Sequence, residues 1–274
     1  MARRRLGFWR RFAVTLVKPV VTVWTRRTWA GMEHLPQEGG IIIAANHISH
    51  ADPLVSAHFI YDAGRFPQFL GKASVFKVPV VGWILRRAWQ IPVERGSADA
   101  ARSLETLIAA LAKGGAVVIY PEGTTTRHPD LWPMRGKTGA ARLALSTGAP
   151  VIPLAMWGPE RIFDPRTKRF SVRPRIPVTV VAGPPVDLAR WAGQTPTKAT
   201  LDEVTDEIML RLRDLLAGIR GGTPPPLWSP PTPRPPTDLA APDLAAPDFA
   251  ALDPGGAATP GTGTAADGAG GAAR

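Results

Sequence analysis

Short apolar runs alternate with amphipathic stretches along the first 220 residues of the chain. The runs contain many β-branched residues, which is typical of buried strands, and the amphipathic stretches repeat their apolar residues at helical spacing. Strands are predicted at 41–45, 69–72, 91–95, 116–120, 151–157 and 178–182, and helices at 53–63, 97–113, 136–146 and from 200 onward, with a compact helix around Trp83 and Leu85.

This alternation predicts an α/β fold with a mixed or mostly parallel central sheet flanked by helices. We expect the α/β domain to span residues 31–220. Thr200-Leu201-Asp202-Glu203 has the form of a capping box, which predicts that the last helix begins there.

A polar cluster follows the first apolar run. His47 comes soon after it, and Asp52-Pro53 has the form of a helix start, because proline is tolerated in the first turn and its predecessor avoids the α region. The intervening turn can fold back so that the Asp52 carboxylate meets Nδ1–H of His47, which leaves Nε2 free as a base. The alternative is that both residues merely cap and turn the chain.

The first 30 residues mix basic and apolar side chains and contain no acidic residue. The apolar stretches are interrupted at Lys18 and Pro19 and are too short to cross about 30 Å of hydrocarbon. We predict basic amphipathic helices over residues 1–30 that lie in the interface of anionic membrane lipids. An ordinary core helix with a solvated basic flank is the alternative. No small-residue cleavage site follows a clean apolar core, so a signal peptide is not expected.

The composition changes at Gly221 to proline, alanine, glycine and threonine, and Asp-Leu-Ala-Ala-Pro recurs at Asp238 and Asp243. So little apolar surface cannot offset the entropy of ordering, and residues 221–274 are predicted to be a disordered tail.

The net charge of the chain indicates which kinds of partner it can bind. The formal net charge is +11, and residues 221–274 hold two arginines and five aspartates, so residues 1–220 carry +14. Such a domain should bind anionic surfaces or phosphorylated substrates. The chain has no cysteine, which excludes disulfides, thiol catalysis and cysteine metal sites. Nucleic acid is not an expected partner, because basic residues do not alternate with stacking aromatics on a recognisable module.

Four blocks occur in an order that resembles the PlsC-type 1-acyl-sn-glycerol-3-phosphate acyltransferases, or lysophosphatidic acid acyltransferases. They are Asn-His-Ile-Ser-His-Ala-Asp at 46–52, a segment from Lys72 that ends on Arg95, Tyr-Pro-Glu-Gly-Thr at 120–124, and Val-Ile-Pro-Leu at 151–154. One block alone would be weak evidence, whereas four in order are specific.

The resemblance implies transfer of a fatty acyl group from acyl-CoA or acyl-carrier protein to the free hydroxyl of 1-acylglycerol-3-phosphate, giving phosphatidic acid. The expected general base is His47, oriented by Asp52. The acyl donor is a co-substrate, and neither a resident cofactor nor a metal is expected. The implied location is the cytoplasmic face of the cell membrane, as a peripheral or monotopic protein.

The other blocks supply candidates for binding the acceptor. The guanidinium of Arg95 can fork onto phosphate oxygens, and Lys72 and Lys77 could add positive charge. Within Glu122-Gly123-Thr124, the carboxyl group could accept a hydrogen bond from the glycerol hydroxyl, and the glycine would let backbone approach the ligand. A turn residue paired with an arginine is the alternative for Glu122.

Two departures from the family pattern affect the acceptor. Thr125 and Thr126 stand where the family often has Arg-Ser, with Arg127 displaced, and Trp89-Gln90 replaces a frequent glycine. Glycerol 3-phosphate or another lyso-lipid is therefore an alternative acceptor.

Different classes of function remain open. An acyl-enzyme on Ser49 is disfavoured, because direct transfer with His47 as the base requires no covalent intermediate. A metal site of His47, His50 and Asp52 is possible by spacing alone. A non-catalytic basic membrane-binding protein is the third alternative, and it would keep its function after His47→Ala.

Overall fold

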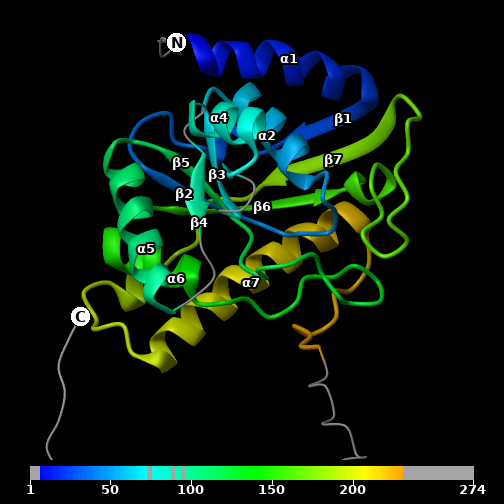
Figure 1. The fold of residues 1–274 in the computed structure, drawn as a ribbon. Helices are drawn as coiled ribbons and strands as arrows, with labels where there is room; N and C mark the ends of the chain where they lie inside the picture. The colour runs from blue at the N-terminus through cyan, green and yellow to red at the C-terminus, as the bar shows by residue number, and fades with distance from the viewer. Residues whose placement is uncertain (1–6, 73–75, 88–89, 94–96, 231–274) are drawn as a thin grey trace, which may run out of the picture. The chain divides into compact units, whose positions relative to one another are not determined.

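A sheet of seven strands forms the centre of the fold (Figure 1). The structure is a computed structural model that describes residues 7–72, 76–87, 90–93 and 97–230. The strand order is β1-β7-β6-β2-β5-β3-β4, and every neighbouring pair is parallel except β6 and β7. The bounds are β1 (Thr25–Ala30), β2 (Ile41–Ala45), β3 (Pro67–Lys72), β4 (Ile91–Val93), β5 (Ala116–Ile119), β6 (Val151–Trp157) and β7 (Ile176–Ala182).

Helices cover both faces of this sheet, as expected of a mostly parallel one. In Figure 1, α1, α2 and α4 lie above the sheet, whereas α6 and α7 lie below it, so the predicted α/β class is confirmed. The bounds are α1 (Phe8–Trp24), α2 (Asp52–Asp62), α4 (Pro79–Arg87), α5 (Ser97–Ala112), α6 (Gly139–Thr147) and α7 (Lys198–Arg220), with 3₁₀ turns η1 (Met32–His34), η2 (Pro159–Arg161) and η3 (Ala189–Trp191).

The central strand β2 shows why two cores form. Successive side chains of a strand point to opposite faces, so Ile41 and Ile43 join the core with Phe59 of α2. Ile42 and Ala44 join the other core with α5, α6 and α7. All five residues of β2 are fully buried, which explains their continuous apolar run.

The register of β2 and β5 places the candidate chemistry at one edge. These strands are parallel neighbours, with Ala44 opposite Ile119. The chain therefore leaves both strands at the same edge, and the segments beginning at Asn46 and Tyr120 emerge side by side. The edge at the carboxyl ends of the strands is where open α/β sheets bind ligands.

The N-terminal segment differs from the prediction in two respects. One helix, α1, runs through Lys18 and Pro19, where several helices were predicted over residues 1–30. Residues predicted as helical up to 30 instead form β1, which pairs with β7 at the sheet edge. Because β1 lies at the edge of the sheet, the polar residues Arg26, Arg27 and Thr28 can be exposed to solvent within a strand.

The C-terminal boundaries also shift. Thr197, rather than Thr200, caps α7, because its side chain accepts the Thr200 N–H at 3.1 Å. Glu203 does not complete a capping box; it accepts a hydrogen bond from the Trp191 indole at 3.0 Å. Residues 221–230 of the predicted tail are described, and Trp228 forms a bridge to Met134, while 231–274 lie outside the described residues.

Candidate active site

His47 and Asp52 meet in the turn between β2 and α2. The His47 Nδ1 lies 2.8 Å from the Asp52 Oδ2, which also accepts the backbone N–H groups of Ile48 and Ser49 at 2.7 and 2.8 Å. A carboxylate can only accept, so an ionised Asp52 places the imidazole proton on Nδ1 and leaves Nε2 as the acceptor. The His47 side chain is 15% exposed, which gives it access to a substrate.

The burial of Asp52 is unusual for an acid. It is the first residue of α2 rather than its N-cap, which is Ala51, and it is completely buried. Burial raises its pKa above the ordinary value, while His47 and the two backbone N–H groups act in the opposite direction. Its Oδ1 atom has no hydrogen-bond partner within the described structure. A buried carboxylate needs a hydrogen-bonded partner, and the contact with Nδ1 of His47 supplies one.

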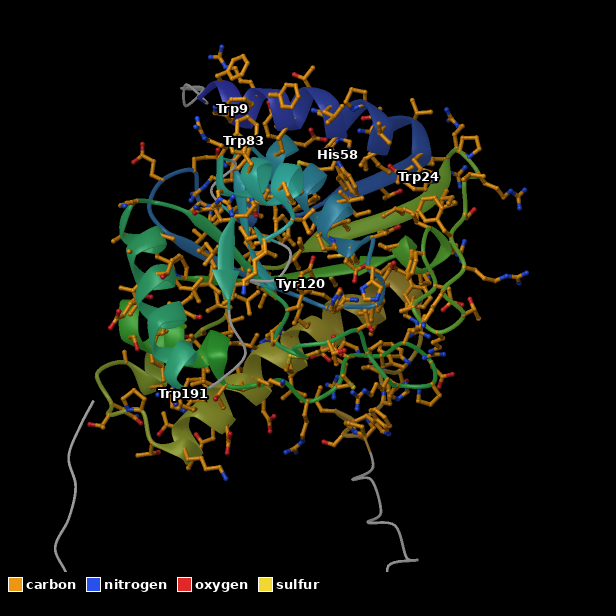
Figure 2. The ribbon with its side chains drawn as sticks, in the orientation of Figure 1. Trp9, Trp24, His58, Trp83, Tyr120 and Trp191 are labelled. Atoms are coloured by element: carbon orange, nitrogen blue, oxygen red, sulfur yellow. The ribbon has the colours of Figure 1, made fainter. Side chains whose placement is uncertain are left out.

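The Tyr120 ring packs against the imidazole of His47. The two rings are stacked, with centroids 4.4 Å apart and an interplanar angle of 26°. The Tyr120 hydroxyl lies 3.2 Å from Ser56 Oγ of α2, and burial raises the pKa of the phenol well above its ordinary value. Figure 2 shows Tyr120 at the centre of the molecule. Sequence reasoning gave this residue no role, although its place directly after β5 was the available signal.

Glu122 is hydrogen-bonded to the backbone of the His47 turn. Its two carboxyl oxygens accept the backbone N–H groups of His47 and Met134 at 3.0 and 3.1 Å, and the residue is only 3% exposed. Thr126 donates its N–H to the His47 carbonyl at 2.7 Å and its hydroxyl to the Trp132 carbonyl at 2.7 Å. Burial raises the pKa of Glu122 to about 8. These two contacts give Glu122 a positioning role, and its predicted hydrogen bond to the acceptor stays a prediction.

Gly123 and Thr124 line a pocket of about 380 Å³ beside this turn. Three cationic residues complete its wall, namely Arg127, Arg135 and Lys137. Gly123 has a φ of +72°, and a side-chain carbon there would lie 3.0 Å from Lys137 Cε, so glycine lets the lysine fold over the turn. From the sequence, Arg127 was only displaced from the family position. The three cations lie at separate positions of the loop from Thr124 to Lys137, so no local pattern joins them.

The predicted phosphate ligands Lys72, Lys77 and Arg95 stay a prediction. Lys72 is the last residue of β3, and only its backbone is described. Lys77 is exposed in the turn before α4. Arg95 lies outside the described residues. The described cations that gather beside the His47 turn are those of the Gly123 pocket.

The hydroxyl of Ser49 is engaged structurally. It donates to the Phe163 carbonyl at 2.7 Å, accepts the Ala51 N–H at 3.0 Å, and is buried. The His50 ring is exposed, with its centroid 6.3 Å from that of His47. Within the described ranges, no three His, Cys, Asp or Glu side chains gather in a metal-binding arrangement. Neither the Ser49 nucleophile nor the metal alternative gains support from this geometry.

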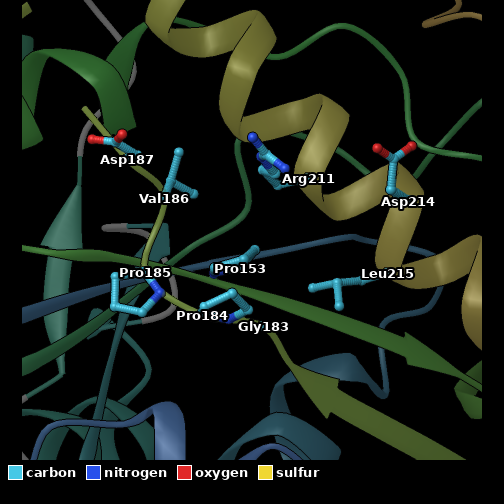
Figure 3. A pocket seen from close by; sticks show the side chains of 9 residues that line it. All are labelled: Pro153, Gly183, Pro184, Pro185, Val186, Asp187, Arg211, Asp214 and Leu215. Atoms are coloured by element: carbon cyan, nitrogen blue, oxygen red, sulfur yellow. The ribbon is translucent and has the colours of Figure 1, made fainter. Parts of the chain in front are cut away.

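A second pocket lies away from this site, between α7 and the end of β7 (Figure 3). Its volume is about 460 Å³, and prolines form much of its wall. The charged groups that α7 contributes already have partners, since Arg211 pairs with Glu207 at 2.9 Å and Asp214 with Arg213 at 2.8 Å. We assign it no part in the chemistry.

Comparison with known proteins agrees with this geometry. Residues 26–157, which hold strands β2 to β6 and the His47 turn, match the family model described as Acyltransferase. Over this segment the chain is similar to acyltransferases of the PlsC type.

The relatives differ in the acceptor lipid that their names specify. A 1-acyl-sn-glycerol-3-phosphate acyltransferase of Borreliella burgdorferi is 27% identical over 68% of this chain and 71% of its own length. A lyso-ornithine lipid O-acyltransferase of Pseudomonas aeruginosa is 35% identical over 41% of each chain. The crystal structure of PlsC from Thermotoga maritima matches with a TM-score of 0.56 at 21% identity, covering 79% of this chain and 83% of that one, which supports the fold.

Proposed function

We propose that this protein acylates 1-acylglycerol-3-phosphate with a fatty acyl group from acyl-CoA or acyl-carrier protein, giving phosphatidic acid. The observation that carries the proposal is the contact of His47 Nδ1 with Asp52 Oδ2 at 2.8 Å, which leaves Nε2 available beside the strand edge. The named Borreliella relative supports the choice of acceptor.

In the proposed mechanism, His47 Nε2 takes the proton of the acceptor hydroxyl while the oxygen attacks the thioester carbonyl carbon. The Asp52 carboxylate stabilises the imidazolium that forms. The tetrahedral intermediate then collapses, the carbon–sulfur bond breaks, and the imidazolium returns the proton to the departing thiolate. Direct transfer needs no acyl-enzyme, in keeping with the buried and hydrogen-bonded hydroxyl of Ser49.

Two groups of cations are candidates for the acceptor phosphate. Arg95, with Lys72 and Lys77, remains the group proposed from the sequence. Arg127 and Lys137 of the Gly123 pocket are the group favoured by proximity to the His47 turn. Arg95→Ala and Arg127→Ala, measured separately, distinguish them, because the residue that binds phosphate should chiefly raise the acceptor KM.

We propose that α1 attaches the enzyme to the membrane interface. Exposed apolar residues recur along one face of this helix at Phe8, Phe12, Leu16, Val20 and Val23, with exposed fractions between 44% and 70%. Trp9 of α1 packs on Trp83 of α4, with ring centroids 4.4 Å apart, so this face continues onto the body of the domain (Figure 2). None of the helices within the described ranges is long and apolar enough to span a bilayer.

The decisive experiment supplies purified protein with lysophosphatidic acid and labelled acyl-CoA or acyl-carrier protein. We expect labelled phosphatidic acid from the parent and almost none from His47→Ala. Undiminished turnover by His47→Ala would refute the mechanism and favour a role without this base. Vesicle binding by an inactive parent protein would favour the non-catalytic membrane-binding alternative.

A second acceptor is favoured by the Pseudomonas relative, whose name specifies a lyso-ornithine lipid. The same His47 and Asp52 chemistry would serve that hydroxyl. Parallel reactions with lysophosphatidic acid, lyso-ornithine lipid and glycerol 3-phosphate, compared by kcat/KM, would identify the preferred acceptor.

A further inference from the structure

A short basic hairpin, residues 161–175, connects η2 to β7. Phe163 and Phe170 form an isolated antiparallel bridge, and the Asp164 N–H donates to the Arg169 carbonyl at 3.0 Å. The hairpin contains one acidic residue, and its carboxylate is held by the tip itself, accepting the Arg166 N–H at 2.8 Å and the Thr167 hydroxyl at 2.9 Å. Its six basic residues are Arg161, Arg166, Lys168, Arg169, Arg173 and Arg175.

This basic hairpin is fixed to the C-terminal end of α1. The Trp24 indole donates to the Ser171 carbonyl at 3.0 Å, and its ring lies 4.9 Å from that of Phe170. The Arg175 N–H donates to the Val23 carbonyl at 3.2 Å. Figure 1 shows the hairpin beside the end of α1, and Figure 2 places Trp24 at their junction. The two elements therefore present one continuous surface.

The base of the basic hairpin also contacts the candidate active site. The Phe163 carbonyl accepts the Ser49 hydroxyl at 2.7 Å, and the Phe163 ring lies 5.3 Å from that of His50. The Arg166 guanidinium donates to the Pro129 carbonyl at 2.7 Å. A ligand bound along the hairpin would thus have a fixed orientation relative to the His47 turn.

The surface of the basic hairpin combines exposed apolar groups with unpaired positive charge. Phe170 is 57% exposed and Val172 is 82% exposed. Lys168, Arg169, Arg173 and Arg175 are all exposed, and none has a carboxylate within ion-pair distance in the described part of the chain. Basic residues around exposed apolar side chains are the pattern that binds anionic lipid headgroups and the acyl boundary together.

We propose that the basic hairpin binds the surface of an anionic bilayer and, with α1, forms a two-point attachment. A single interfacial helix leaves the protein free to rotate about the helix axis, whereas a second contact fixes that rotation. The hairpin then holds the His47 turn at a defined orientation to the lipid surface. This consequence for catalysis rests on the proposed acylation of a membrane lipid, but the lipid contact itself does not.

The apolar continuity with α1 favours a bilayer over a folded acidic protein as the partner. An acidic carrier protein would complement the arginines, but it would not require Phe170 and Val172 to lie next to the exposed face of α1. We therefore treat carrier-protein docking as an outcome that the test must separate.

The test compares sedimentation of the full chain with vesicles of phosphatidylcholine alone and of phosphatidylcholine with phosphatidylglycerol. The double variant Arg169→Gln/Arg173→Gln should bind the anionic vesicles more weakly, by roughly fivefold for each cation removed. The matched control Arg142→Gln/Lys198→Gln removes two exposed cations from α6 and α7 and should bind like the parent. Unfolding curves confirm that each variant is folded.

A second variant tests the apolar part. Val172→Ser should reduce binding to both kinds of vesicle, whereas the charge variant should differ from the parent only on anionic vesicles and at low salt. Equal binding by the parent, the charge variant and Val172→Ser would overturn the proposal. So would intact vesicle binding with lost capture of an acidic carrier protein, which would make the hairpin a donor-docking surface.

His47→Ala separates this inference from the proposed function. It should bind vesicles like the parent while producing no acylated lipid. A parent protein that acylates no lyso-lipid, yet loses anionic vesicle binding in the charge variant, would refute the proposed function alone. If the parent acylates normally and the hairpin variants bind vesicles as strongly as the parent, this inference alone is refuted.

Discussion

The carboxyl group of Glu122 accepts the backbone N–H of His47 at 3.0 Å, across a separation of 75 residues. This bond joins the turn after β5 to the turn after β2 and fixes the backbone from which the imidazole projects. Because burial raises the pKa of Glu122 to about 8, the folded protein holds this proton far more tightly than the unfolded chain does.

We predict that Glu122 makes stability fall as pH rises. Its pKa is higher in the folded state than in the unfolded state, so its stabilising contribution is complete below about pH 4.5 and is lost as pH approaches about 8. The limiting slope is about 1.4 kcal/mol per pH unit. Urea unfolding across this range should show the slope in the parent, whereas Glu122→Gln, which cannot ionise, should lack it. The same slope in both proteins would contradict the assignment.

Asp52→Asn should remove most of the activity without unfolding the protein. The amide oxygen can still accept the Ile48 and Ser49 N–H groups, but no anion remains to stabilise the imidazolium. We expect kcat to fall by roughly 10⁴-fold, the loss found when the acid of a catalytic His–Asp pair is replaced by its amide. Asp62→Asn, at the other end of α2, is the matched control and should change kcat little. A loss of less than tenfold in Asp52→Asn would show that the carboxylate is not needed.

Tyr120 offers a test of stacking apart from hydrogen bonding. Tyr120→Phe keeps the ring over His47 and loses only the contact with Ser56, so kcat should be nearly unchanged. Tyr120→Leu removes the stacked ring, which is worth about 0.5–1.5 kcal/mol, and should lower kcat by up to roughly tenfold. Steady-state kinetics of both variants decide the matter, and equal effects would exclude stacking as the cause.

Arg220, the last residue of α7, should stabilise the loop that follows Glu122. Its guanidinium lies 4.1 Å from the Trp132 ring and 4.4 Å from the Trp157 ring, and it donates to the Asp130 carbonyl at 2.7 Å. Arg220→Ala should cost about 1–3 kcal/mol of unfolding free energy, with a smaller loss in Arg220→Lys. Arg211→Ala removes an exposed pair with Glu207 on the same helix and should cost under about 0.5 kcal/mol. Equal losses of unfolding free energy in Arg220→Ala and Arg211→Ala would rule out a stabilising role for the contacts of Arg220 with Trp132 and Trp157.

Helices and strands could be predicted from the sequence where the burial of side chains follows the period of a single helix or strand. The run at Ile41–Ala45 forms β2 because every residue of a central parallel strand is covered on both faces. β1 was missed because it is an edge strand whose arginines face solvent. The N-cap of α7 lies three residues before the predicted Thr200, because the Thr197 side chain accepts the Thr200 N–H.

The candidate site divides in the same way. His47 and Asp52 are five residues apart, so their contact depends on one turn and could be inferred from it. The role of Glu122 could not, since its partners His47 and Met134 belong to two different segments. The cations of the Gly123 pocket likewise converge only after the loop from Thr124 to Lys137 has folded.

The α/β alternation, the imidazole–carboxylate pair and the excess of positive charge could be inferred from the chain alone, because each depends on neighbours along the chain or on composition. The hydrogen bond of Glu122 to His47, the stacking of Tyr120 on the imidazole and the contact of the basic hairpin with α1 became evident only in the folded protein. These contacts form between segments brought together by burial of the sheet, and the position of a distant partner is not encoded in local periodicity.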